Sequence, residues 1–243
     1  MRFDILTIFP NIFDSYLNES IIKRGREKKL VDIRMHDIRK FSNDTHKKVD
    51  DRPFGGGPGM VLKVEPLVCA LDDILHTSKI KKSKIKIILF SAGGEQFDAK
   101  KAAQWAKKYD QIIMIAGRYE GVDERIFKFL QAIRPKRIRL RRTSYPPEAD
   151  PPQADKLQAL SIGPYVLTGG ELPAMVVIDA ISRHISGVLG KGESLEETRY
   201  GVGVPTYTRP EVFEYRGKKY RVPKELLSGD HKKIEEWRRK QSS

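Results

Sequence analysis

The spacing of apolar residues in the first half of the chain predicts strands and helices in alternation. Continuous apolar runs indicate buried strands, whereas apolar residues three and four positions apart indicate amphipathic helices. We expect strands over residues 3–9, 31–35, 85–90 and 111–116, and helices over residues 11–29, 65–75 and 99–108, the last of them capped by Asp98. This alternation is typical of an α/β fold with a parallel sheet.

Two stretches interrupt the pattern. Residues 39–59 are polar and rich in glycine without periodicity, which predicts a long loop, and loops of that length are often functional. Six basic residues fall within 134–142 and four prolines follow, so we interpret the segment from about 131 to 160 as a basic, proline-rich insertion. This insertion is either a solvated run of charge or a direct contact for RNA phosphates.

The last third of the chain predicts a second, smaller part. An ordered pattern resumes at Ser161 and leads into a helix over 173–185, whereas 187–206 has the composition of a linker. The tail ends in a helix that Ser228 or Asp230 could cap. We therefore expect a first domain over 1–186, an interdomain linker over 187–206 and a small helical domain over 207–243.

The charge balance then indicates the class of partner. The 243 residues include 46 Lys or Arg and 32 Asp or Glu, so the formal net charge is +14. A strongly basic protein favours a polyanionic partner, because its cations release the counterions condensed on phosphates. We favour nucleic acid over a membrane surface, since no basic amphipathic helix appears. The opening residues carry charge within their apolar stretch, unlike a signal peptide, and we expect a cytoplasmic protein.

Cysteine and histidine usage argues against structural metal chemistry. Cys69 is the only cysteine, so one chain can form neither a disulfide framework nor a cysteine-based metal site. We expect Cys69 to be a buried structural thiol. The five histidines are scattered without a ligand spacing, and we expect no protein-bound metal.

Glycines gather in four places that could approach a ligand closely. They occur at 55–59, at 93–94, at 117 and 121, and at 169–170. In an open α/β sheet, ligands bind where loops leave the carboxyl ends of strands, so several such loops could surround one nucleoside-type ligand. The phosphate-binding P-loop and the dinucleotide fingerprint are both missing, and each glycine cluster alone is more often turn chemistry.

Four longer motifs carry a resemblance to a known family. Residues 50–60 (DDRPFGGGPGM), 117–125 (GRYEGVDER), 165–175 (YVLTGGELPAM) and 207–210 (YTRP) resemble, in this order, the bacterial tRNA (guanine-37-N1)-methyltransferases of the TrmD family. The resemblance implies the SPOUT fold, in which the α/β domain ends in a trefoil knot and a small helical tRNA-binding domain follows. It also implies an obligate homodimer that uses S-adenosylmethionine to methylate N1 of guanosine 37 in the anticodon loop of tRNA.

The resemblance also assigns roles to single residues. The family's catalytic arginine corresponds to Arg183. The cofactor contacts correspond to residues in three of the loops around the glycine clusters: Leu89, Ser91, Gly117, Tyr119, Glu120, Ile162, Gly163, Pro164, Tyr165, Val166, Leu167, Gly169, Gly170 and Pro173.

The sequence departs from the family pattern at the expected general base and in the cofactor loop. Thr198 stands where the family has an aspartate, and a threonine hydroxyl has no accessible pKa for proton removal near neutral pH. We therefore expect Glu197 to take this role, with Glu196 as the alternative. Pro164 replaces a second aspartate and removes a backbone N–H.

The implied reaction needs one base and one cation. N1 of neutral guanine carries a proton, so a carboxylate must accept it while a cation stabilises the charge that grows on O6. Glu197 and Arg183 are our candidates for these roles. Two alternatives remain open: a non-catalytic or impaired RNA-binding homologue, and a SPOUT methyltransferase that acts on another RNA.

Overall fold

The chain forms two compact units, which are considered separately. The computed structural model describes residues 1–78, 84–132, 157–190, 195 and 203–241. The first unit is Met1–Leu189 and the second is Gly190–Ser243. Within the described ranges, no helix is long and apolar enough to cross a membrane.

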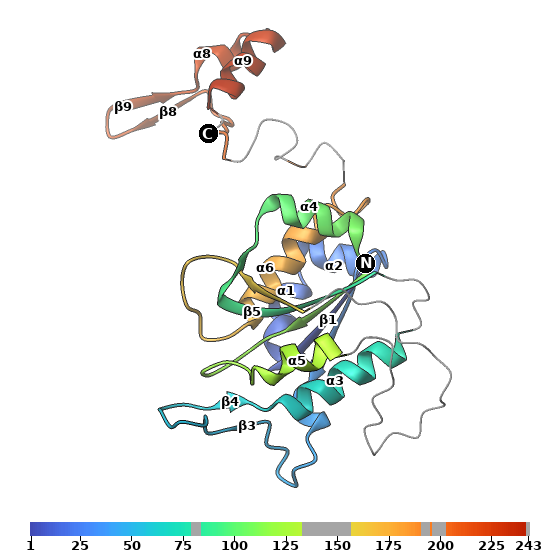
Figure 1. Cartoon of the computed structure of the whole chain (residues 1–243). Coiled ribbons are helices and arrows are strands. Elements are labelled where there is room, and N and C mark those ends of the chain that lie inside the picture. Colours follow the sequence, from blue (N-terminus) through green and yellow to red (C-terminus); the bar gives the residue numbers. More distant parts are fainter. Residues whose placement is uncertain (79–83, 133–156, 191–194, 196–202, 242–243) are drawn as a thin grey trace. The chain divides into compact units, whose positions relative to one another are not determined.

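A five-stranded sheet forms the centre of the first unit (Figure 1). The strand order is β2-β1-β6-β5-β7, and every neighbouring pair is parallel. The strands are β1 (Arg2–Thr7), β2 (Asp32–Asp37), β5 (Ile85–Gln96), β6 (Gln111–Ile115) and β7 (Gln158–Ser161). The predicted α/β fold with a parallel sheet is confirmed.

Helices cover both faces of this sheet, as Figure 1 shows. The side chains of β6 alternate between two apolar cores: Ile112 and Met114 point into one, and Ile113 and Ile115 into the other. Because both faces are buried, the strands are continuous apolar runs. The first core is closed by η1 (Pro10–Phe13), α1 (Asp14–Leu17), α2 (Ser20–Glu27), α4 (Ala99–Lys108) and α6 (Glu171–Ser182). The second is closed by η2 (Ile38–Phe41), α3 (Val64–Thr77) and α5 (Arg125–Ala132).

Several predicted boundaries were wrong. The helix expected over 11–29 is divided into η1, α1 and α2, and the backbone turns at Ser20, where φ is +51°. The helix expected over 173–185 is α6, which begins two residues earlier and ends at Ser182. Asp98 does cap α4, since its carboxylate accepts a hydrogen bond from the Lys101 amide at 2.7 Å. Cys69 is half-buried rather than buried, and desolvation raises the pKa of its thiol.

Residues 39–59 are also less irregular than expected. Their first residues continue η2, and β3 (Asp50–Asp51) pairs antiparallel with β4 (Val61–Leu62). The glycine-rich residues 55–59 therefore form the tip of a short hairpin, where Phe54 is fully exposed.

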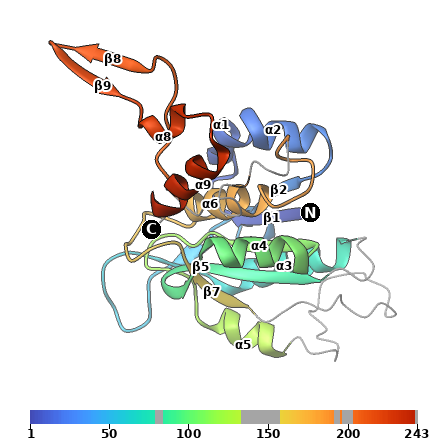
Figure 2. The ribbon, with the colours of Figure 1, turned by 90° about the horizontal axis from the view of Figure 1, so that it is seen from above.

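The second unit contains a hairpin that the sequence pattern did not predict. Strands β8 (Val212–Tyr215) and β9 (Lys218–Arg221) pair antiparallel, and both views show them extending beyond the two helices of their unit, α8 (Lys224–Leu227) and α9 (His231–Gln241) (Figure 1, Figure 2). The chain reverses at Arg216 and Gly217, whose φ angles of +49° and +74° suit a two-residue hairpin turn. Asp230 caps α9, because its carboxylate accepts hydrogen bonds from the amides of Lys232 and Lys233.

Candidate active site

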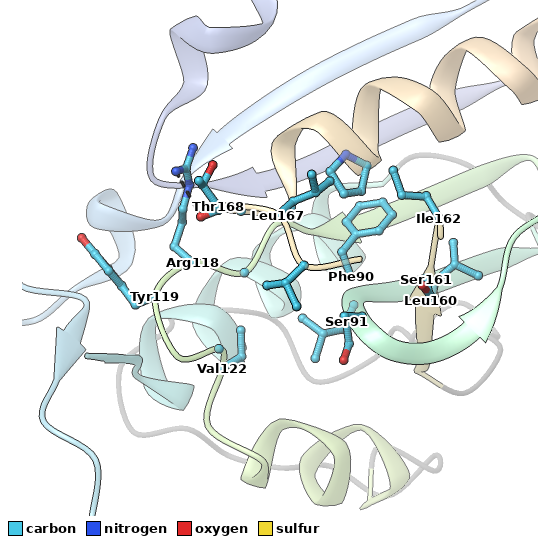
Figure 3. A pocket seen from close by; sticks show the side chains of 18 of the residues that line it. Phe90, Ser91, Arg118, Tyr119, Val122, Leu160, Ser161, Ile162, Leu167 and Thr168 are labelled. Atoms are coloured by element: carbon cyan, nitrogen blue, oxygen red, sulfur yellow. Dashed lines mark hydrogen bonds between the residues drawn. The ribbon is translucent and has the colours of Figure 1, made fainter. Parts of the chain in front are cut away.

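One pocket of about 290 Å³ lies where β6 and β7 end. Its lining is drawn from residues 89–92 of β5, the loop 117–124 and the segment 160–173 (Figure 3). Loops at the carboxyl ends of parallel strands are the usual ligand sites of α/β sheets. The volume is near the lower end of the range for small-molecule sites, which begins at about 300 Å³.

The structure brings the predicted cofactor residues together around this pocket. Every one of them lines it except Pro164, whose side chain is exposed: the lining includes Leu89, Ser91, Gly117, Tyr119, Glu120, Ile162, Gly163, Tyr165, Val166, Leu167, Gly169, Gly170 and Pro173. Contact of these residues with a cofactor remains a prediction.

The loops that line the pocket approach each other so closely that only glycine fits. A Cβ atom on Gly170 would lie 2.6 Å from the Cα of Ala116, which is a backbone atom that cannot move aside cheaply. The amide of Gly170 donates to the carbonyl of Gly117 at 2.9 Å, and an isolated antiparallel bridge joins Arg118 to Gly169. The loop after β6 and the segment before α6 therefore form one continuous wall.

A buried carboxylate stabilises this wall through hydrogen bonds. Glu171 is 1% exposed, and its two oxygens accept hydrogen bonds from the Thr7 hydroxyl at 2.8 Å and from Nε of Arg118 at 2.9 Å. Arg118 also donates to the carbonyl of Thr168 at 3.3 Å, and its guanidinium lies 4.8 Å from the centre of the Phe9 ring. Figure 3 shows Arg118 directed toward Thr168. Glu171 thus links the end of β1 to both loops of the pocket.

Sequence reasoning missed this network. Glu171 and Arg118 were part of the quoted motifs, but neither was assigned a role. A charged residue directly after two glycines and inside a largely apolar helix is the signal that could have identified Glu171, because buried carboxylates occur mainly where they are paired.

The pocket rim is connected to the glycine-rich hairpin. The amide of Glu120 donates to the carbonyl of Met60, and the amide of Leu62 donates to the carbonyl of Gly121, both at 3.0 Å. A Cβ atom on Gly59 would lie 2.7 Å from Oε1 of Glu120. Tyr119 is 54% exposed on this rim. The C-terminal end of the tip 55–59 therefore lies next to the pocket rim.

Pro164 is compatible with the local backbone. The amide of Tyr165 donates to the carbonyl of Gly163 at 2.9 Å, which closes a three-residue turn with Pro164 at its centre. The Ser161 hydroxyl donates to the same carbonyl, also at 2.9 Å. Neither bond requires an N–H at position 164, so the proline does not disrupt this turn.

Of the two predicted catalytic residues, the structure describes Arg183, and this residue does not line the pocket. Arg183 is half-buried at the C-cap of α6. A helix rises 1.5 Å per residue, so Arg183 is about 18 Å along the axis from Glu171 at the other end of α6. Glu197, Glu196 and Thr198 lie outside the described residues, as does most of the basic insertion.

The pocket lining carries charges of both signs. Among residues that the structure describes, no three His, Cys, Asp or Glu side chains are grouped so that they could hold a metal ion. The pocket itself is lined by the carboxylates of Glu120 and Glu124 and by the guanidinium of Arg118. Because Arg118 is already paired with Glu171, the two carboxylates give the lining a negative balance. This balance beside an apolar wall favours a ligand with both a positive charge and an apolar part.

Comparison with known proteins gives a consistent result. A family model described as tRNA (guanine-1)-methyltransferase TrmD matches residues 1–243. The chain is 43% identical to the tRNA (guanine-N(1)-)-methyltransferase of Clostridioides difficile (strain 630), over 100% of this chain and 92% of that protein. It is 43% identical to the protein of the same name from Moorella thermoacetica, over 100% of this chain and 85% of that protein. It is 42% identical to the protein of the same name from Geobacter metallireducens, over 100% of this chain and 86% of that protein.

Proposed function

The chain belongs to the tRNA (guanine-1)-methyltransferase TrmD family, and from this premise we propose that it transfers a methyl group from S-adenosylmethionine to N1 of guanosine 37 in the anticodon loop of tRNA. The observation that carries the proposal is the convergence of three distant segments, matching the predicted cofactor residues, on one pocket.

The pocket fits the proposed cofactor. Gly169 and Gly170 let the two loops of the pocket pack together, because a Cβ atom would collide with Arg118 at position 169 and with the backbone of Ala116 at position 170. This packing shapes one wall of the pocket. The carboxylate of Glu120 at the pocket favours a positive charge. S-adenosylmethionine supplies a methyl group activated by a sulfonium cation. Glu120 would stabilise that charge, while Leu89, Ile162 and Leu167 would contact the apolar part of the molecule.

The chain path is proposed to be the trefoil knot of the SPOUT fold. In support, the segment that leads from β7 into α6 runs against the loop after β6, through the hydrogen bond between Gly170 and Gly117 and the bridge between Arg118 and Gly169. Knots are close to absent from folded chains, so local sequence pattern alone could not indicate one.

A second copy of the chain is proposed to cover an exposed apolar face. This face is formed where η1 contacts α6 and where Tyr16 of α1 is hydrogen-bonded to Asp179 of α6. Each large apolar side chain on it is about two-fifths to one-half exposed: Phe9, Ile12, Tyr16, Leu172 and Val176. Leu172 and Val176 are four residues apart on α6, and the same stripe continues to Arg183. In a homodimer built on this face, Arg183 would lie at the interface. It could then act at a shared site that it does not reach within its own chain.

Proton removal is assigned to the linker. Guanine N1 must lose its proton as the methyl group arrives, and Glu197 is our candidate acceptor, with Glu196 as the alternative. Arg183 would stabilise the negative charge that develops on O6. The role of Arg183 follows from the family resemblance. Glu197 is chosen because Thr198, at the position of the family's aspartate, has no accessible pKa for proton removal.

The substrate fits the charge of the protein. The net charge of +14 favours a polyanion such as tRNA, and we assign tRNA binding to residues 207–243 together with the first unit. Because tRNA is used in the cytoplasm, we expect the protein to work there.

A methyl-transfer assay tests the proposal. The full chain, S-adenosylmethionine and a tRNA transcript with G37 should yield N1-methylguanosine, whereas a transcript with the G37→A change should yield none. Methylation of a different RNA position would favour another SPOUT methyltransferase. Absence of turnover with retained tRNA binding would favour a non-catalytic RNA-binding homologue.

A further inference from the structure

One face of the β8–β9 hairpin carries three exposed aromatic side chains. Phe213 and Tyr220 are cross-strand partners with ring centroids 6.1 Å apart. Tyr215 is two residues beyond Phe213, and their rings are nearly parallel at an interplanar angle of 8° and a centroid distance of 6.4 Å. The three residues are 55%, 53% and 52% exposed in chain order. These side chains form what we call the aromatic face of the hairpin.

Cations accompany the aromatic face. The guanidinium of Arg216 at the turn lies 5.2 Å from the centre of the Tyr215 ring. Lys218 pairs in register with Tyr215, so its side chain is on the same face. Residues 212–221 contain four Lys or Arg and a single acidic residue, Glu214. Glu214 lies on the opposite face with Arg221 and with Lys219, to which it is ion-paired at 3.6 Å. The hairpin is therefore both cationic and aromatic.

Hairpin stability explains only part of this arrangement. A cross-strand aromatic pair such as Phe213 and Tyr220 stabilises two strands that have little other support. It does not explain why all three rings remain about half exposed, nor why Arg216 and Lys218 lie beside them. Flat aromatic surfaces flanked by cations are suited to stacking on nucleic-acid bases while the cations bind neighbouring phosphates.

We propose that the aromatic face of the β8–β9 hairpin binds unpaired bases of an RNA by stacking, with Arg216 and Lys218 contacting adjacent phosphates. The inference rests on the proposed function in that the RNA is the tRNA substrate. It adds that this unit recognises bases that are free to stack, in addition to the charge of the backbone.

Binding of full-length protein to tRNA, measured by filter binding over a range of salt concentrations, tests the proposal. Phe213→Ile and Tyr220→Ile keep strand propensity but remove the flat ring, so each should weaken binding by about 5- to 100-fold with little change in the salt dependence. Lys218→Gln should instead lower the slope of log K against log salt by about 0.7 to 0.9. Glu214→Thr is the control on the opposite face of the same strand. It also releases Lys219 from its ion pair with Glu214, so binding should stay the same or strengthen.

Kinetics separates this role from catalysis. In methyl-transfer assays the two aromatic variants should raise KM for tRNA, while kcat and the affinity for S-adenosylmethionine stay the same. If the unchanged protein binds tRNA through this face but methylates none, the proposed function fails and the inference stands. Unchanged tRNA affinity in both aromatic variants, or an equal loss in Glu214→Thr, would overturn the inference.

A measurement on the unchanged protein keeps the test valid if a variant does not fold. Tetranitromethane nitrates exposed tyrosines, and mass spectrometry locates the product. We expect tRNA to protect Tyr215 and Tyr220, and a blunt RNA duplex of equal charge to protect them much less, because its bases are already stacked. Equal nitration with and without tRNA would overturn the inference. Protection by anionic vesicles but not by tRNA would overturn it as well.

Discussion

The carboxylate of Glu171 and the guanidinium of Arg118 are joined at 2.9 Å, although 53 positions separate them in the sequence. The side chain of Arg118 is 18% exposed and that of Glu171 is 1% exposed. An ion pair with so little solvent around it holds its geometry, because breaking it would leave a charge uncompensated in a poorly solvated environment. The pair therefore fixes the loop after β6 relative to the segment that precedes α6.

Substitutions of Glu171 should reduce stability and cofactor binding to different degrees. Glu171→Ala leaves Arg118 without its partner and should cost about 3–5 kcal/mol in the free energy of unfolding and weaken binding of S-adenosylmethionine. Glu171→Gln can still accept from Arg118 and donate to Thr7, so its effect should be smaller. Urea unfolding and titration calorimetry measure the two quantities.

Thr7→Val is the matched control for this series. It removes the hydroxyl that donates to Glu171 but leaves the ion pair, and we expect a loss of about 1–3 kcal/mol. An equal loss of cofactor affinity in Thr7→Val and Glu171→Ala would contradict the role given to Arg118.

Gly170→Ala should damage the pocket without a change in charge. The added Cβ would lie 2.6 Å from the Cα of Ala116, so the two loops would have to separate. Displacements of about 1 Å in a binding site reduce function strongly, and we expect S-adenosylmethionine to bind about 10- to 100-fold more weakly. Gly93→Ala is the control, since a Cβ there meets no atom within 4 Å. Calorimetry that shows equal affinity for both variants would refute the close-approach argument.

The sheet could be predicted because strands that are buried on both faces are continuous apolar runs in the sequence. The runs that form β5 and β6 are apolar whichever face they turn to, so their positions were found within a few residues. The extension of β5 from Ser91 to Gln96 could not be found, because those residues are small or polar and mostly exposed. Their strand geometry depends on pairing with Leu160 and Ser161, which local pattern does not reveal.

The hairpin and the buried carboxylate escaped prediction for related reasons. The turn of β8–β9 uses Arg216 and Gly217 with positive φ, whereas the strongest sequence signals for such turns begin with asparagine or aspartate. Glu171 resembles an ordinary acidic residue in the first turn of a helix until Thr7, 164 positions away, is known to bind it. Pairings between distant segments decide both features.

Acid should destabilise the first unit through Asp4. Burial alone would raise the pKa of this carboxyl, but hydrogen bonds from His36, Arg2 and Gln111 outweigh burial and lower it. A carboxyl whose pKa is lower in the folded state stabilises the fold above its unfolded pKa of about 3.9, and this contribution is lost as the pH falls through the folded value.

The Asp4→Asn variant tests this linkage. It leaves Arg2 without its partner and should reduce the free energy of unfolding by about 3–5 kcal/mol at pH 7. The difference in the free energy of unfolding between the variant and the unchanged protein should become smaller as the pH falls below about 4. Urea unfolding at a series of pH values measures this difference. If the difference in the free energy of unfolding does not change with pH, Asp4 is not the source of the acid sensitivity.

Val176→Glu should separate the proposed dimer. Val176 is 46% exposed on the apolar face of η1, α1 and α6, and a charge there would be buried by a second copy. Analytical ultracentrifugation should show a monomer, and methyl transfer should fall because Arg183 would no longer reach a shared site. Lys107→Glu on the exposed side of α4 is the control and should leave the protein dimeric. A dimeric Val176→Glu protein would place the interface elsewhere.

The proton acceptor is proposed at a place where the family resemblance expects an aspartate and this chain has Thr198. If Glu197 removes the N1 proton, Glu197→Gln should lower the methyl-transfer rate by about 10²- to 10⁴-fold, the usual range for loss of a general base, with cofactor affinity nearly unchanged. Glu196→Gln should be mild by comparison and Arg183→Ala severe.

Thr198→Asp provides the complementary test, because it places a carboxylate where the family resemblance expects an aspartate. In the Glu197→Gln background this change should recover much of the lost rate, since the new carboxylate can accept the same proton. Single-turnover rates against pH should show the acidic limb disappear in Glu197→Gln and return in the double variant. If Glu197→Gln keeps the full rate and the same pH profile, Glu197 is not the base, and Glu196→Gln should then show the loss instead.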